Sequence, residues 1–205
     1  EDPDTEAGLR EAFELFTEDK NVIDKIGDIK VDGDKATAYV EAYQEAREDP
    51  AFATIVLGVN ASFVKDGEDW KIEGLEFVSP EKPDGVTSVH IDANEFAFGF
   101  NPEDITSGKV SFEVANVGKQ PHHFALSQVP DDFDIEAALQ SEEEPEGEVH
   151  IGAVPPFEPG KTFDIVFTAD LEPGRYVMLC FMPDTDDPEG TPHYLKGMYK
   201  EFRIE

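Results

Sequence analysis

The sequence of 205 residues predicts two domains, a small α+β unit followed by an all-β Greek-key sandwich. Three observations predict this fold class. A segment of helical periodicity comes first and is followed by two pairs of strand-like runs joined by Asp/Gly turns. A stretch rich in proline and turn formers occupies residues 79–85. Short alternating runs then recur to the end of the sequence. We therefore expect domains at residues 1–78 and 86–205, with a linker at residues 79–85.

The first domain is predicted to combine one helix with a curved antiparallel sheet. Leu9, Phe13 and Phe16 share one face of an amphipathic helix over residues 5–17. Two long hairpins follow, with "VDGDK" and "KDGED" as their turns. Over about residues 20–78 these hairpins resemble the second half of an NTF2-like domain, which implies an α+β fold of which this chain carries part. Trp70 is expected to be a core aromatic residue in this sheet.

The second domain is predicted to be all β. Residues 89–100 alternate along a single strand, with Phe96, Phe98 and Phe100 on one face. An acidic helix and loop interrupt the β pattern at residues 131–148. The remaining runs with period two are residues 108–118, 122–129, 161–169, 174–181 and 198–205.

Charge and hydropathy exclude several classes of function. The net charge is −31 and the acidic excess is spread over both halves, so every phosphate of a nucleic acid would be repelled. No apolar run reaches the roughly 18 to 20 residues that span a bilayer. An acidic surface of this kind indicates solubility in high salt or a location outside the cytoplasm. We expect an extracytoplasmic protein whose signal or anchor segment is absent from this chain.

The single cysteine, Cys180, cannot form an intrachain disulfide, so it is a buried apolar residue, a nucleophile or a metal ligand. Three stretches provide partners for it. "NVGKQPHHFAL" contains His122 and His123 at the start of a strand, and "PHYLKGMYKEF" places His193 and Met198 before the last strand. One thiolate, two imidazoles and one thioether form a soft ligand set that suits copper.

At these residues the second domain resembles the cupredoxins, the family of plastocyanin and azurin. The matching motifs are N-x-G-x-x-P-H, ending in His122, G-x-Y-x-x-x-C, ending in Cys180, and H-x4-M, from His193 to Met198. The resemblance implies one type 1 (blue) copper held by these four residues, with His193 exposed as the route for electrons. Whether His122 or His123 is the ligand stays open, because alternation points the two side chains to opposite faces of the strand.

We expect an exported electron-transfer protein and not an enzyme. One alternative is a carrier or storage protein that holds Cu(I) with Cys180, a histidine and Met182 or Met198. Another is a metal-free binding or adhesion module. The redox partner is expected to be cationic, because the twelve residues between Cys180 and His193 carry four carboxylates, those of Asp184, Asp186, Asp187 and Glu189.

Overall fold

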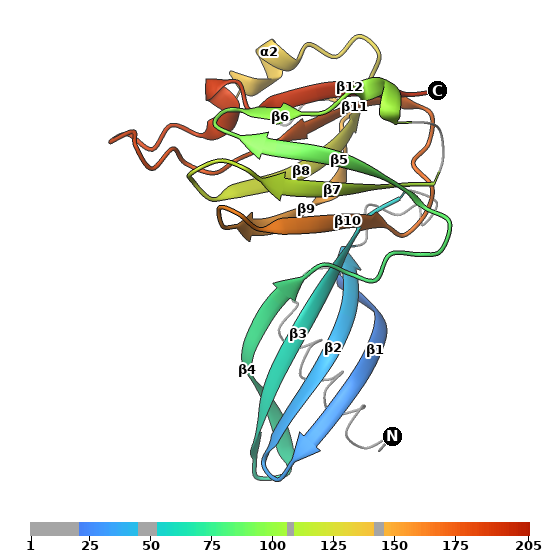
Figure 1. Ribbon diagram of the computed structural model, residues 1–205, viewed down its shortest axis with the longest axis vertical. Helices are drawn as coiled ribbons and strands as arrows, with labels where there is room; N and C mark the ends of the chain where they lie inside the picture. The colour runs from blue at the N-terminus through green and yellow to red at the C-terminus, as the bar shows by residue number, and fades with distance from the viewer. Residues whose placement is uncertain (1–20, 45–52, 106–108, 142–145) are drawn as a thin grey trace. The chain divides into compact units, whose positions relative to one another are not determined.

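The computed structural model describes residues 21–44, 53–105, 109–141 and 146–205 (Figure 1). The chain divides into two compact units. The first consists of Glu1–Glu45 and Val56–Glu81, and the second of Ala46–Ile55 and Lys82–Glu205. The helix expected over residues 5–17 lies outside the described residues. No helix in the described part of the chain is long and apolar enough to cross a membrane.

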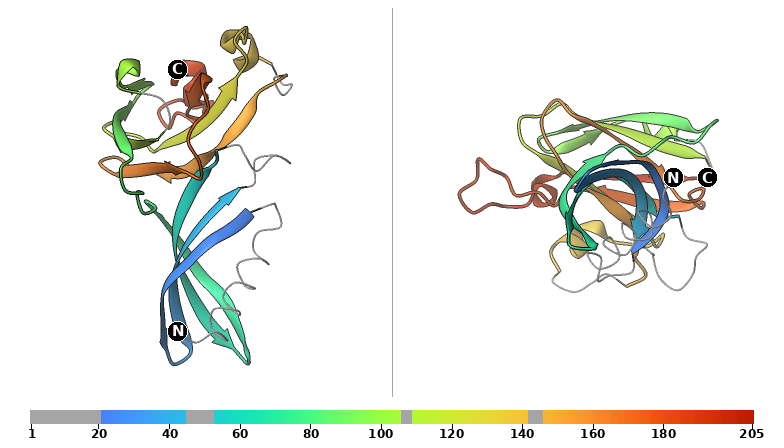
Figure 2. Two further views of the ribbon diagram at one scale, coloured as in Figure 1. Left: turned by 90° about the vertical axis from the view of Figure 1, so that its right-hand side faces the viewer. Right: turned by 90° about the horizontal axis from the view of Figure 1, so that it is seen from below.

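The first unit contains a curved antiparallel sheet in the order β1-β2-β3-β4 (Figure 2). The two predicted hairpins are confirmed. Each has a two-residue turn that begins with a glycine of positive φ, 62° at Gly33 and 71° at Gly67, where a side chain would be strained. The strands are β1 (Asn21–Asp32), β2 (Lys35–Gln44), β3 (Ile55–Asp66) and β4 (Asp69–Val78).

The α+β class expected for the first domain is wrong, and nothing supports the NTF2-like resemblance. The described residues of this unit contain strands, turns and a short irregular segment, and no helix. Its apolar cluster is built from alternating residues of β2 and β3, including Ala38, Ala61 and Phe63, with Trp70 packed against it as expected. The period-two pattern and the turns therefore predicted these strands correctly. The α+β class depended on one helical segment that the structure does not describe.

The second unit is a sandwich of two four-stranded sheets, as predicted (Figure 1). One sheet has the order β10-β7-β5-β6 and the other β12-β11-β8-β9. Aromatic residues fill the space between them. The ring of Phe112 lies 6.0 Å from that of Phe124 and 5.9 Å from that of Phe202, and Tyr176 stacks on Phe202. The strands are β5 (Thr87–Asn94), β6 (Ala97–Gly99), β7 (Val110–Asn116), β8 (His122–Val129), β9 (Val149–Phe157), β10 (Thr162–Phe167), β11 (Gly174–Leu179) and β12 (Tyr199–Ile204).

Two strands differ from the sequence prediction. Strand β9 was missed because it contains Pro155 and Pro156, but it lies at the edge of its sheet, where a missing backbone donor is tolerated. The single strand predicted over residues 89–100 is divided in two. Asn94 pairs with Ala97, so Glu95 and the residue after it form the turn between β5 and β6. This turn brings Glu95 to the candidate site described below.

Three short helical segments complete the described structure: η1 (Pro102–Asp104), α2 (Ile135–Leu139) and η2 (His193–Lys196). Helix α2 lies in the predicted acidic insertion. The side chain of Asp134 caps it by accepting a hydrogen bond from the backbone N–H of Ala137, 3.1 Å away.

Candidate metal centre

His122, Cys180 and His193 converge at one end of the sandwich. The Sγ atom of Cys180 lies 4.0 Å from Nδ1 of His122 and 3.5 Å from Nδ1 of His193. One ligand atom from each residue lies within 4.8 Å of the other two. All three residues have an exposed fraction of 0%. Among the described residues, no other group of His, Cys, Asp and Glu side chains comes together in this way.

The fold assembles the cluster from neighbouring strands. His122 is the first residue of β8, and Cys180 directly follows β11, which pairs with β8 in antiparallel register. His193 begins η2 after the long loop and is held by backbone hydrogen bonds. Its N–H donates to the carbonyl of Met182 over 2.8 Å, and the N–H of Tyr194 donates to the carbonyl of Cys180 over 3.0 Å. The backbone therefore fixes the distance between thiol and imidazole.

Met198 is buried, and its backbone is hydrogen-bonded to those of Cys180 and His193. Its carbonyl accepts a hydrogen bond from the N–H of Cys180 over 3.1 Å, and its N–H donates to the carbonyl of His193 over 3.0 Å. Gly197 ends η2 directly before Met198 and has a φ of 103°, a conformation that strongly favours glycine. The structure thus brings the backbone of Met198 to the cluster, and its role as an axial ligand stays a prediction.

His123 lies outside the cluster. Its backbone N–H donates to Sγ of Cys180 over 3.3 Å, while its ring packs against Phe181 with 5.7 Å between ring centroids. Burial, followed by the charge of His150, lowers the pKa of His123 to about 4. The alternation along β8 that left two candidates in the sequence therefore directs His122, and not its neighbour, toward Cys180.

The protonation states of the three side chains suit metal binding. Burial lowers the pKa of both His122 and His193, so that their rings are neutral and can donate a lone pair to a metal ion. Burial also raises the pKa of the Cys180 thiol, which therefore carries a proton when no metal is bound. Binding a metal ion at this cluster must release that proton.

The distances in the cluster are compatible with a shared ion. Zinc sites show metal–sulfur distances of about 2.3 Å and metal–nitrogen distances of about 2.0 Å, which separate the two donor atoms by at most about 4.3 Å. The observed separations of 4.0 and 3.5 Å are within this limit. A thiolate with two imidazoles is also a soft donor set of the kind that favours copper. The residues present therefore fit the predicted metal.

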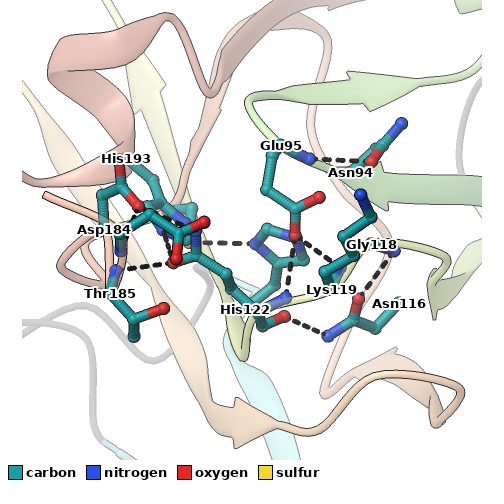
Figure 3. Close-up of polar contacts among 12 residues, drawn as sticks. Asn94, Glu95, Asn116, Gly118, Lys119, His122, Asp184, Thr185 and His193 are labelled. Atoms are coloured by element: carbon teal, nitrogen blue, oxygen red, sulfur yellow. Dashed lines mark hydrogen bonds and ion pairs between the residues drawn. The ribbon is translucent and has the colours of Figure 1, made fainter.

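The outer nitrogen of His122 faces a carboxylate (Figure 3). Its Nε2 atom lies 3.2 Å from Oε1 of Glu95, within the range of an ion pair although not aligned as a hydrogen bond. The same oxygen accepts hydrogen bonds from the backbone N–H groups of Lys119 and Gln120 over 2.7 and 2.9 Å. Burial on its own would raise the pKa of Glu95, but these backbone hydrogen bonds outweigh burial and lower it.

The ring of His193 is covered, and the expectation that this residue is exposed is wrong. Its Nε2 atom lies 3.4 Å from Oε1 of Gln120, and its ring meets that of Phe96 edge to face at 4.9 Å between centroids. Lys196 in turn covers Phe96, with Nζ 5.5 Å from the ring centroid. Solvent and partner proteins therefore do not reach the imidazole of His193 directly.

The long loop between Cys180 and His193 is held at the site by hydrogen bonds to Gln120 and by ion pairs with Lys196. Asp184 accepts a hydrogen bond from Nε2 of Gln120 over 2.7 Å and forms an ion pair with Lys196. Lys196 also lies 2.9 Å from Asp187. Oε1 of Gln120 accepts from the N–H of Thr185 over 2.7 Å. Asp184 and Asp187 therefore share one lysine, whose single charge offsets one of these two carboxylates.

Sequence reasoning missed the residues around the two imidazoles. Glu95 lies in the alternating run of residues 89–100, for which a single strand was predicted, and no role was predicted for it. Gln120 occupies a variable position of the N-x-G-x-x-P-H motif, so the motif does not specify it. The contacts of both residues depend on how three loops pack together, which a linear pattern does not describe.

Comparison with known proteins gives weak likenesses only. The sequence matches no family model and no curated protein. Among solved structures, the reduced auracyanin of the photosynthetic bacterium Roseiflexus castenholzii is 21% identical with a TM-score of 0.38. The match covers 59% of this chain and 99% of that chain.

Two multicopper oxidases are also similar in part. The enzyme from Campylobacter jejuni is 11% identical with a TM-score of 0.35, and the match covers 85% of this chain and 42% of that chain. The McoA enzyme from Aquifex aeolicus is 14% identical with a TM-score of 0.32, covering 83% and 41%. The chain therefore spans less than half the length of either oxidase. Likenesses this weak neither place the chain in a family nor assign it an activity.

Proposed function

We propose that the protein is a cupredoxin-like electron carrier with one type 1 copper held by His122, Cys180, His193 and Met198. The observation that carries this proposal is the buried cluster in which Nδ1 of two neutral imidazoles faces one thiol. Two imidazoles and a thiolate with a distant thioether are the donor set of blue copper sites. Copper, when bound there, supplies a one-electron couple.

The protein's own residues supply rigidity. Electron transfer is fast when the ligands move little between the two oxidation states. Here backbone hydrogen bonds link Cys180, His193 and Met198, three of the predicted ligands, to one another. The N–H of His123 donates to the sulfur, which stabilises the thiolate form that a metal needs.

Burial favours electron transfer over the alternatives. A copper carrier must release its ion to a partner, and an enzyme must admit a substrate to a coordination position. All three converging residues have no exposed surface, and Gln120 and Phe96 cover His193. Electrons, unlike ions or substrates, cross a few ångströms of packed protein.

The partner and location are further parts of the proposal. The net charge of −31 favours a cationic redox protein and disfavours nucleic acids. The same acidic composition supports an extracytoplasmic location.

Copper titration of the purified protein tests the proposal, with Cys180→Ser as the matched variant. We expect one Cu(II) per chain and an intense thiolate-to-copper absorption band, because the thiolate is both the strongest donor and the source of the colour. The serine variant should unfold at about the same denaturant concentration but show no band.

Other outcomes would point elsewhere. Tight, colourless binding of Cu(I) without a stable Cu(II) form would indicate a carrier or storage protein. Absence of stoichiometric copper would refute a metal function. A band that persists in Cys180→Ser would remove the thiol from the site.

A further inference from the structure

The two imidazoles of the cluster have different outer partners. Nε2 of His193 faces the neutral amide oxygen of Gln120 at 3.4 Å, whereas Nε2 of His122 lies 3.2 Å from the charged carboxylate of Glu95. Glu95 keeps some exposed surface, with a side-chain exposed fraction of 18%, against 0% for His122. The outer nitrogen of His122 therefore faces a charged group (Figure 3), whereas the outer nitrogen of His193 faces a neutral one.

The carboxylate is fixed in this place by the backbone around it. The N–H groups of Lys119 and Gln120 both donate to Oε1, and they belong to the loop that leads into His122. The N–H of Glu95 itself donates to Oδ1 of Asn94 over 2.9 Å, which sets the conformation of the turn. Two of these three hydrogen bonds come from the loop that leads into His122, so the carboxylate of Glu95 is held by the loop that carries the histidine.

Gly118 leaves the room for this arrangement. A Cβ atom at that position would lie 2.3 Å from Oε1 of Glu95 and 2.8 Å from Nε2 of His122, closer than real Cβ contacts. The glycine is therefore required by the approach of the carboxylate to the ring. The contact between Glu95 and His122 therefore depends on the small size of Gly118 and on two backbone N–H donors.

We propose that Glu95 is a positioning residue for the metal centre, and this inference rests on the proposed function. Its carboxylate keeps the proton of His122 on Nε2, so that Nδ1 is free and faces Cys180. Its negative charge also makes the imidazole a stronger donor and stabilises the more highly charged copper ion. The outer nitrogen of His193 faces a neutral amide oxygen instead, and burial outweighs the charges of Asp184 and Glu95 that also act on this ring.

The first test uses the metal-free protein. Nitrogen-15 NMR of the imidazoles reports which ring nitrogen carries the proton. We expect His122 of the wild type to carry it on Nε2. A proton on Nδ1 in the wild type would overturn the proposal, and this result does not depend on copper or on any variant.

The second test compares Glu95→Gln with Glu172→Gln in the copper-loaded protein. Glutamine keeps an oxygen that accepts the two backbone hydrogen bonds but removes the charge. Glu172 is exposed and precedes β11, at the end of that strand opposite to Cys180. Its replacement by glutamine removes the same charge as Glu95→Gln does, but away from the metal centre. We expect Glu95→Gln to lower the ratio of Cu(II) to Cu(I) affinity about tenfold, a rise of about 59 mV in reduction potential. Glu172→Gln should leave the potential unchanged.

The outcomes separate this inference from the proposed function. If the wild type binds blue copper and the two glutamine variants have the same potential, Glu95 has no tuning role while the proposed function stands. If the wild type binds no copper, the proposed function fails. The NMR measurement then decides alone whether Glu95 sets the protonated nitrogen of His122.

Discussion

At the scale of single residues, the candidate site depends on which atoms the fold directs toward Cys180. His122 and His123 are adjacent in sequence, yet one ring joins the cluster and the other packs on Phe181. The sequence motif favoured the same histidine, but alternation alone could not decide between the two. The register of β8 against β11 makes the choice, because it sets which face of β8 lies toward Cys180.

Alanine substitution of each histidine tests this assignment. His122→Ala should lose the blue band and regain it when imidazole is added, because an open coordination position is left in a buried site. His123→Ala is the matched control and should keep the band, since its contact with the sulfur is made by the backbone N–H. Loss of the band in His123→Ala alone would move the ligand assignment by one residue.

Met198→Leu tests the axial ligand. Leucine is similar in volume, so the buried packing should be kept at a cost below about 1.5 kcal/mol. We expect the blue colour to remain and the reduction potential to rise, because a thioether donor stabilises Cu(II) relative to Cu(I). Cyclic voltammetry of both proteins measures the difference, and a fall in potential would argue against an axial role.

At the scale of elements, the strands were predictable and the loops were not. Period-two patterns and glycine turns located the hairpins of the first unit and the ligand-bearing strands β8 and β11. Strand β9 was missed because its prolines are tolerated only at an edge, and edge position is a property of the assembled sheet. The cover over His193 was missed for a related reason, because Gln120 and Phe96 come from two separate loops.

The contribution of the loop between Cys180 and His193 to stability is expected to depend on pH. Hydrogen bonds from Lys196 and Gln120, and then from the N–H of Asp186, lower the pKa of Asp184 from 3.8 to about 2. The folded state therefore binds this proton more weakly than the unfolded state does. The resulting stabilisation is complete above about pH 4 and is lost as the pH falls toward about 2.

Asp184→Asn should therefore lower the free energy of unfolding at pH 6 and have little effect near pH 2. Denaturant unfolding at several pH values measures the difference between wild type and variant. Asp170→Asn, at an exposed position of the same unit, is the charge-matched control and should show a much smaller difference. A loss of stability in Asp184→Asn that does not change with pH would contradict the ionic role of Asp184.

At the scale of the whole molecule, charge is the dominant feature. A net charge of −31 creates a long-range field that attracts cationic partners. The individual carboxylates differ in how exposed they are to solvent. In the loop beside the site, Asp184 and Asp187 are paired with Lys196. Asp186 and Glu189 are exposed. Asp186 and Glu189 are therefore the two loop carboxylates most open to a docking partner.

Replacing Asp186 with Asn and Glu189 with Gln together should slow electron exchange with a cationic partner severalfold at low salt. The effect should disappear at high salt, where screening acts within a few ångströms. Stopped-flow kinetics at both ionic strengths measures it, with the double change Asp170→Asn and Glu172→Gln as the control. Equal rates for both double variants at low salt would show that the loop does not steer docking.

X-ray absorption spectroscopy of the copper-loaded protein shows which atoms surround the metal. It therefore tests whether one thiolate and two imidazoles hold a single copper ion in the buried cluster. We expect the nearest ligands to be one sulfur, from Cys180, and two imidazole nitrogens, from His122 and His193. A copper ion surrounded by nitrogen and oxygen only, with no sulfur ligand, would contradict the account.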